Sequence, residues 1–148
     1  MKKRVVITGC GVVHSLGEDA NTFWNAIKQG KNGIKTVTKF DTTDFSTKVG
    51  AQIDDFDPSK YIEKKEAKRM DLFTQYAVVA AQQAVNMSGV DFKSMDPYRA
   101  GVIIGSGVGG LQTLEDNCRS LFEKGPKRVS PFFVPMMIAN MASGQVAI

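Results

Sequence analysis

The sequence predicts a fold of the α/β class, in which strands and helices alternate along the chain. Two short β-branched runs, "RVVITG" and "AGVII", each lead through a glycine-rich turn into a segment that reads as a helix. In a third segment, residues 68–87, apolar residues recur every three or four positions, which indicates a helix with one buried face. Strand, glycine turn and helix therefore follow one another at least twice.

Composition places the chain among soluble globular proteins. It has 148 residues, 43% hydrophobic and 23% charged, close to globular averages and long enough for one domain with a core. Two scattered cysteines make no secreted disulfide framework, which favours a reducing cytoplasm. The apolar run between Arg4 and Thr8 is too short for a signal peptide, and no segment is long enough to span a membrane.

The first half of the chain is expected to hold two helices. A buried strand at Arg4–Gly9 precedes a helix at Asp19–Gln29, with Asp19 or Asn21 as N-cap and Gly30 as the C-terminal stop. Its expected apolar face consists of Phe23, Trp24 and Ile27. Residues 31–62 are interrupted by Asp, Thr, Pro and Gly, so we expect an irregular region with one or two short strands. The helix at 68–87 then ends at Gly89.

The second half repeats the pattern and ends in an apolar segment. We expect a strand at Ala100–Ile104, a helix at Leu111–Phe122 and an extended "KRVSPFFVP", with Pro135 in the first turn of a last helix. That last segment, "PMMIANMASGQVAI", is apolar nearly all round, as helices inside larger cores are. The expectation is therefore an N-terminal piece of a longer protein.

The spacing of Gly105, Gly107 and Gly110 matches the G-x-G-x-x-G pattern of dinucleotide-binding loops. The acidic residue that should follow about 20 positions later is missing, because that region reads "FEKGPKRVSP". Glycines that let a strand and a helix pack closely are the stronger interpretation. A dinucleotide-binding domain remains the weaker alternative.

Other cofactor chemistry is disfavoured. No G-K-[ST] follows the glycines, and one histidine with two scattered thiols makes zinc improbable, so we expect neither metal nor cofactor. His14 is more readily a solvated loop residue than a base. Cys10 and Cys118 are more readily packed side chains than nucleophiles.

The net charge of +4 is concentrated in three stretches, at residues 2–4, 60–69 and 124–128. Such clusters are either solvated faces or sites for an acidic partner. Nucleic acid would call for basic residues interleaved with exposed aromatics or for a reading helix, and neither is evident. Neither nucleic acid nor a membrane is therefore expected as a partner.

Five stretches carry a family resemblance, in this order and spacing: "RVVITGCGVV", "FD", "KRMDLFTQYAVVAAQQA", "GVIIGSGVGGL" and "SPFFVPMMIANMASGQVAI". Together they resemble the N-terminal part of the β-ketoacyl-acyl carrier protein synthases of type II, which are thiolase-like condensing enzymes. The resemblance spans the whole chain and implies part of a layered, duplicated αβαβα fold and a homodimer. It also implies fatty-acid elongation by decarboxylating Claisen condensation with malonyl carrier protein.

The resemblance also assigns residues. The family's acyl-accepting Cys follows the stretch matching "SGQVAI", and its two catalytic His lie in the second half of the fold, so residues 1–148 match only the N-terminal part of the N-terminal domain and include no catalytic residue. Cys10, Cys118 and His14 do not match catalytic positions. The resemblance implies an acyl pocket lined by Gly107, Val108, Leu111 and Phe133, the last reaching across a dimer interface. It implies binding of the acidic acyl carrier protein by Lys64, Lys65, Lys68, Arg69, Lys127 and Arg128.

A second function class stays open at this point. A non-catalytic chain that pairs with an active condensing enzyme would use the same interface. The residues that follow the matched stretch decide between the two, because an active enzyme must carry the Cys there.

The first testable prediction concerns the chain alone. Because it matches none of the family's catalytic positions, the isolated 148-residue polypeptide should release no CO₂ and form no 3-oxoacyl product from acyl and malonyl carrier proteins. Mass spectrometry of the carrier-bound products measures this. Turnover above a no-protein control would contradict the assignment.

Overall fold

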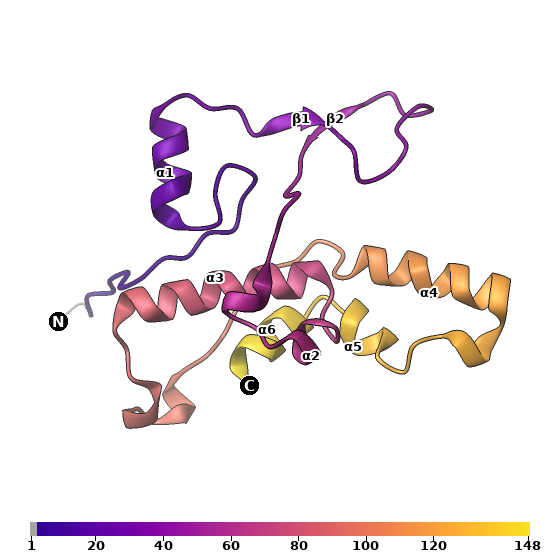
Figure 1. Ribbon diagram of the computed structural model, residues 1–148. Coiled ribbons are helices and arrows are strands. Elements are labelled where there is room, and N and C mark those ends of the chain that lie inside the picture. Colours follow the sequence, from indigo (N-terminus) through magenta and orange to yellow (C-terminus); the bar gives the residue numbers. More distant parts are fainter. Residues whose placement is uncertain (1–2) are drawn as a thin grey trace.

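The computed structural model describes residues 3–148, and it is mainly helical (Figure 1). Its α-helices are α1 (Ala20–Lys28), α2 (Lys64–Ala67), α3 (Leu72–Ser88), α4 (Leu111–Lys124), α5 (Phe133–Met137) and α6 (Met141–Ala147). Two antiparallel strands are β1 (Ile34–Thr36) and β2 (Val49–Ala51). Short 3₁₀ turns are η1 (Pro58–Lys60), η2 (Phe92–Ser94), η3 (Pro97–Arg99) and η4 (Pro126–Arg128).

Helix α3 is the central element of the molecule. Figure 1 shows it running across the middle, with α6 and α2 beneath it, α4 and α5 at one end, and α1 with the two strands above. Val79 of α3 and Ala142 of α6 are 2% and 1% exposed, and the α3–α6 contact is the most extensive between two elements. In the described part of the chain, no helix has the length and apolar character needed to cross a membrane.

The ends of α1 and the C-terminal end of α3 follow the signals expected from the sequence, whereas α3 begins at Leu72 and not at residue 68, because Asp71 caps it. Asp19 caps α1 by accepting hydrogen bonds from the backbone N–H groups of Asn21 and Thr22, each at 2.9 Å. The pKa of Asp19 is lowered, mainly by the Thr22 hydroxyl that donates to the carboxylate. Helix α3 ends at Gly89, which takes the left-handed conformation with φ of 66°. The α1 boundaries are confirmed, although Trp24 lies largely in solvent.

The predicted strand at Arg4–Gly9 does not form in this structure. The segment is extended but pairs with no other strand, and the Val5 side chain is 92% exposed. The predicted strand at Ala100–Ile104 is likewise unpaired, and Ile103 is fully exposed. The physical reason is that a strand is defined by hydrogen bonds to a neighbour, which a β-branched sequence by itself does not supply.

After its exposed first residues, the N-terminal segment rests directly on α3. A Cβ atom at Gly11 would lie 1.8 Å from the carbonyl oxygen of Ala80, and one at Gly9 would lie 2.1 Å from that of Ala84. The Gln83 side chain fixes the segment further, because it accepts from the N–H of Val12 at 3.0 Å. Glycine at these positions therefore allows close backbone contact with a helix.

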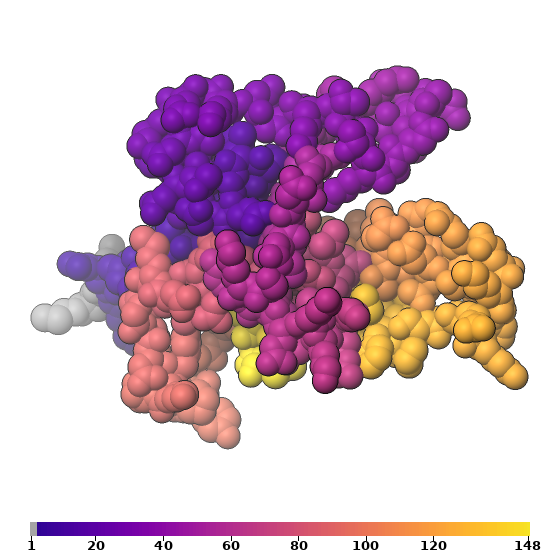
Figure 2. All heavy atoms as spheres, viewed as in Figure 1, coloured from indigo at the N-terminus to yellow at the C-terminus, as the bar shows by residue number. Residues whose placement is uncertain are grey.

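Residues 31–62 form an arm with little regular structure, as the sequence predicts. The arm holds the β1–β2 pair, in which Lys35 lies opposite Gly50. A salt bridge between Lys35 and Asp54 also joins the two sides of the arm. The space-filling view shows an open gap between the arm and α4 (Figure 2). The β1–β2 part of the arm is thus held mainly by its own pairing.

The C-terminal region departs from the predicted extended segment and single helix. Residues 126–128 form a 3₁₀ turn, and the helical region splits into α5 and α6. The break occurs at Ile138, whose ψ of 135° is extended. Pro135 lies in the first turn of α5, where its missing N–H costs nothing.

The close approach on α3 gives a stability prediction. Gly11→Ala places a methyl group into the Ala80 carbonyl and should destabilise the full-length protein by about 1–3 kcal/mol, the usual cost of overpacking. Gly30→Asn is the control, because no atom lies within 4 Å of a Cβ there and Asn tolerates its φ of +67°. Thermal unfolding measures both, and an equal effect of the two changes would contradict the packing role.

Candidate functional site

The glycine loop before α4 is shaped by close packing against the α5–α6 junction. Gly109 has a φ of +81°, and a Cβ there would lie 2.2 Å from the carbonyl oxygen of Met137. The N–H of Gly110 donates to that same oxygen at 2.8 Å. Of the three pattern glycines, Gly105 and Gly107 have open space where a Cβ would be. A packing role for the loop is therefore supported, with the α5–α6 junction as the partner in place of a strand.

The start of α4 is capped by a residue from another helix. Its own N-cap position is Gly110, which has no side chain to accept a hydrogen bond. Asp71, the N-cap of α3, accepts instead through Oδ2 from the N–H of Thr113 at 3.1 Å and from its hydroxyl at 2.5 Å. The same carboxylate accepts from the N–H of Phe73 in α3 through Oδ1 at 3.4 Å. One carboxylate thus serves two helix N-termini.

The residues assigned to the acyl pocket gather around this helix start. Val108 and Leu111 are 65% and 60% exposed, so both present apolar side chains to the outside. Gly107 is exposed beside them. Phe133 is half-buried in the first turn of α5, which packs against α4. The loop and the first turns of α4 and α5 therefore form one neighbourhood.

The first basic cluster comprises Lys64, Lys65, Lys68 and Arg69. Its residues occupy α2 and the turn that leads to Asp71, and all four are exposed. Among the described residues, the salt bridges are Lys35–Asp54 and Arg119–Glu115, so none of the four cations has a carboxylate partner. The positive charge of the first basic cluster is available to an outside partner.

The second basic cluster lies at the end of α4. Lys127 and Arg128 belong to η4, and both are exposed. An open hollow of about 590 Å³ is lined here by Ser120, Lys124 and Arg128. Sequence reasoning assigned Lys127 and Arg128 but left Lys124 and Ser120 out of the site. The four-residue spacing of Ser120 and Lys124 on one helix face was the available signal.

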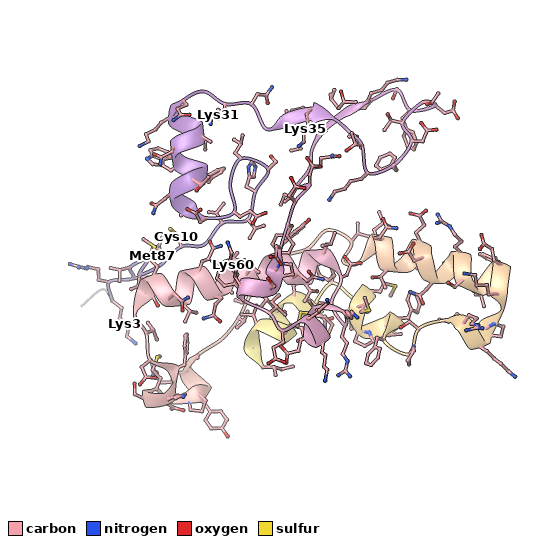
Figure 3. All side chains as sticks on the ribbon, viewed as in Figure 1. Lys3, Cys10, Lys31, Lys35, Lys60 and Met87 are labelled. Carbon is pink, nitrogen blue, oxygen red and sulfur yellow. The ribbon has the colours of Figure 1, made fainter. Side chains whose placement is uncertain are left out.

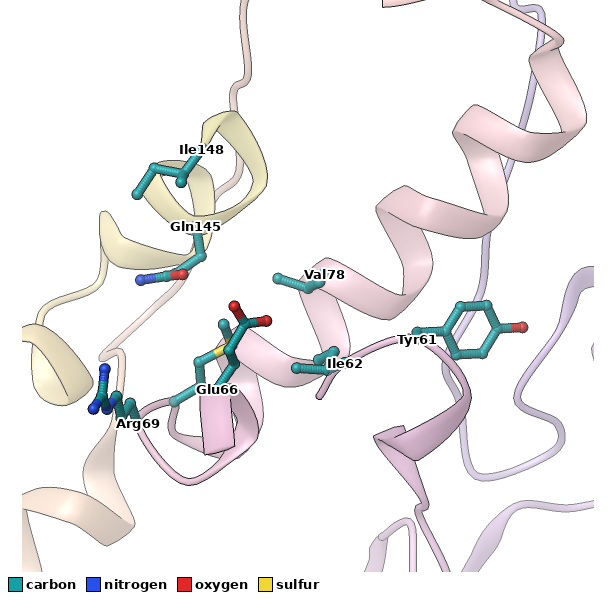
Figure 4. Close-up of a pocket in the computed structure, with 8 residues that line it drawn as sticks. Tyr61, Ile62, Glu66, Arg69, Val78, Gln145 and Ile148 are labelled. Atoms are coloured by element: carbon teal, nitrogen blue, oxygen red, sulfur yellow. The ribbon is translucent and has the colours of Figure 1, made fainter. Parts of the chain in front are cut away.

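Arg69 connects the two basic regions. Its guanidinium lies 4.9 Å from the centroid of the Phe132 ring, a cation–π contact to the segment that follows η4. Arg69 also borders a second cavity of about 400 Å³ between α2, α3 and α6. Figure 4 shows Glu66 and Arg69 beside it, together with Val78 of α3 and Gln145 of α6. The first basic cluster is thereby fixed relative to α5.

The remaining candidate residues stay outside this neighbourhood. Cys10 is exposed, contrary to the packed position expected for it, and its thiol lies 3.6 Å from the Met87 sulfur at the far end of α3 (Figure 3). His14 stacks edge-on against Phe23, and its Nδ1 accepts from the N–H of Leu16. Cys118 is half-buried in α4. Within residues 3–148, no group of three His, Cys, Asp or Glu side chains could hold a metal ion.

Tyr76 is a partly buried aromatic residue near the start of α3. Its ring packs edge-on against Phe56 at 4.7 Å between centroids. Burial raises the pKa of its hydroxyl, and the negative charges of Glu18 and Asp71 raise it further. Tyr76 therefore stays neutral near pH 7 and acts as a packed aromatic residue beside Asp71.

The fold matches solved structures of ketosynthases. One is a type II PKS acyl-carrier protein in complex with its ketosynthase bound to the hexaketide, with a TM-score of 0.80, 28% identity and coverage of 99% of this chain and 38% of that one. Another is the ishigamide ketosynthase/chain length factor, with a TM-score of 0.84, 26% identity and coverage of 96% and 36%. The fold is therefore that of the N-terminal part of a thiolase-like ketosynthase.

The family follows from sequence comparison. The model of the beta-ketoacyl synthase N-terminal domain matches residues 2–148, so the chain belongs to this family. It is 46% identical over 147 residues to the 3-oxoacyl-(acyl-carrier-protein) synthase 2 of Synechocystis and 49% identical over 146 residues to that of Staphylococcus aureus strain COL. These alignments cover 99% of this chain and 35% of each relative. The chain thus spans about a third of the length of the curated relatives it matches.

Proposed function

We propose that this chain is the N-terminal third of a β-ketoacyl-acyl carrier protein synthase of the second type. The complete enzyme elongates fatty acids by decarboxylating Claisen condensation of an enzyme-bound acyl group with malonyl carrier protein. The family match over residues 2–148 and the identities of 44–49% to curated synthases support this. In this proposal the chain supplies binding surfaces, while the acyl-accepting Cys and the two His come from the remaining two thirds.

The exposed apolar surface of the chain supports an origin in a larger protein. Its solvent-accessible area is 11395 Å², against about 7,400 Å² for a compact monomer of this length. The surplus includes β-branched side chains in both segments that the sequence predicts as strands. Such surface needs cover. Further parts of the condensing enzyme and a second copy in a homodimer provide it in this proposal.

Carrier binding is proposed for both basic clusters. The observation that carries it is the Arg69–Phe132 contact, which ties the first cluster to the segment directly after the second. Six exposed cations that pair with no carboxylate of residues 3–148 suit an acidic carrier protein. One of the solved ketosynthases with this fold is itself bound to an acyl-carrier protein. Encounter with the carrier would depend on ionic strength, since exposed charges are screened by salt.

The acyl chain is proposed to lie against Val108, Gly107 and Leu111, with Phe133 contributed across the dimer. Support comes from the exposure of the two aliphatic side chains beside an α4 start that is held rigidly. The proposed site of action is the cytoplasm, because the two cysteines are free and make no disulfide framework of the kind that small secreted proteins carry.

A second candidate is a non-catalytic partner subunit. The similarity to the ishigamide ketosynthase/chain length factor favours keeping it, because the name of that structure joins a chain length factor to a ketosynthase. The condensing enzyme and the non-catalytic subunit would share the surfaces described above. They would differ in the acyl-accepting Cys, which only the enzyme needs. Iodoacetamide labelling of the full-length protein, followed by peptide mapping, separates them: an enzyme carries a reactive Cys beyond residue 148, and a partner subunit does not.

Charge reversal tests carrier binding. Lys65→Glu and Arg69→Glu in the full-length protein should each raise the KM for acyl carrier protein about tenfold, because a repulsive pair replaces an attractive one. A small acyl thioester lacks the carrier and should be accepted as before. Steady-state kinetics with both donors measures the split.

The matched control is Lys31→Glu, an exposed lysine at the start of the arm. It changes the net charge by the same amount without touching either basic cluster. Equal loss with the carrier-bound and the small donor, or an effect of Lys31→Glu as large as that of Lys65→Glu, would contradict the proposal.

Loop substitution tests the acyl contact. Val108→Phe should lower kcat/KM for long acyl chains about tenfold more than for short ones, because the larger ring occupies space that the distal methylenes need. Val108→Ala removes bulk and should leave long chains accepted. Competition between short and long acyl donors, read by mass spectrometry, measures the ratio. An unaltered preference in both variants would contradict the lining role.

A further inference from the structure

Asp71 stands between the two proposed binding surfaces. It lies two positions after Arg69, the last residue of the first basic cluster. Through Thr113, 42 residues later, it reaches the start of α4 and the loop that carries Val108. The half-buried carboxylate of Asp71 therefore bonds to α3, which follows the first basic cluster, and to α4, which follows the Val108 loop.

Its contacts with α4 replace a cap that α4 lacks. Thr113 is the third residue of α4. The N–H at this position of a helix normally donates to the side chain of the N-cap residue, and here it donates to Asp71. Gly110 has no side chain to accept it, and a Cβ at Gly110 would lie 2.9 Å from Asp71 Oδ2. Glycine at 110 and aspartate at 71 thus form a complementary pair. The carboxylate takes the place that a capping side chain would occupy.

The glycine loop is closed across Val108 and anchored on its C-terminal side. The N–H of Gly109 donates to the Ser106 hydroxyl oxygen at 3.0 Å, a bond that spans Val108. The anchor follows, because Gly110 donates to Met137 and Thr113 donates to Asp71. Val108 itself is largely exposed. The direction of its side chain therefore depends on the backbone held at residues 110–113.

The turn between the first basic cluster and Asp71 is also held by hydrogen bonds. The Gln75 side chain donates to the carbonyl oxygens of Ala67 and Met70, at 3.0 and 2.9 Å, and so holds the turn between α2 and α3. The N–H of Gln75 donates to the Asp71 carbonyl oxygen at 3.1 Å. The turn cannot shift without moving Asp71.

We propose that Asp71 is a positioning residue that holds the Val108 loop in register for a bound acyl chain, through its contact with Thr113. This rests on the proposed function, because it assumes that Val108 contacts the chain. Asp71 touches no reacting atom in this role. Its contribution is selective: it governs how well long acyl chains fit and leaves docking of the carrier on the basic clusters intact.

The first test needs no activity. In the full-length protein, Asp71→Asn removes the negative charge and leaves one accepting oxygen for the three donors of Phe73 and Thr113, so exchange of the amides at 110–114 should become about tenfold faster. Hydrogen exchange read by mass spectrometry measures this. Asp91→Asn is the matched control, because Asp91 accepts only within its own turn, from the N–H of Lys93. Unchanged exchange at 110–114 in Asp71→Asn overturns the proposal.

The second test is functional. Asp71→Asn should lower kcat/KM for long acyl chains about tenfold relative to short ones, with the KM for carrier protein unchanged. Thr113→Val should act in the same direction but less, since its N–H remains, and adding it to Asp71→Asn should cause little further loss. Equal loss at all chain lengths indicates a merely structural role and overturns the proposal. If the unsubstituted protein condenses nothing, the proposed function fails, and exchange alone decides whether Asp71 anchors the loop.

Discussion

The hydrogen bonds of the Asp71 carboxylate are the constraint on which the arrangement of helices depends. Three donors from two helices converge on it: the N–H of Phe73, and the N–H and hydroxyl of Thr113. Hydrogen bonds to a charged group contribute about 1.5–3 kcal/mol each, which is large beside the few kcal/mol by which domains are stable. The negative charge also meets the positive ends of two helix dipoles. This one side chain thus joins the N-terminal ends of α3 and α4.

Close backbone approach is the second constraint, and glycine makes it possible. Gly9 and Gly11 bring the N-terminal segment onto α3, while Gly109 and Gly110 bring the α4 loop onto the α5–α6 junction. In each case a single methyl group would collide with a carbonyl oxygen. Packing thus accounts for Gly110 among the three glycines of the dinucleotide-like pattern, while Gly105 and Gly107 have open space where a Cβ would lie.

The candidate site could be predicted from sequence to an uneven degree. The basic clusters were visible because charge runs remain on the surface whatever the fold, and the glycine loop was visible because its composition is unusual. Lys124 and Ser120 were missed because only the hollow that they share with Arg128 links them to the second basic cluster. The Arg69–Phe132 contact joins residues 63 positions apart, and no local pattern indicates it.

The sequence by itself determined where α1, most of α3 and α4 lie, since N-caps, apolar periodicity and terminating glycines act within a few residues of one another. It also determined the family, because five motifs keep their order along the chain. Tertiary structure decided what local signals cannot: whether "RVVITG" and "AGVII" pair as strands, where the last helix breaks, and which carboxylate caps α4. Each depends on a partner distant in sequence, because hydrogen bonds between elements form only once the elements have been brought together.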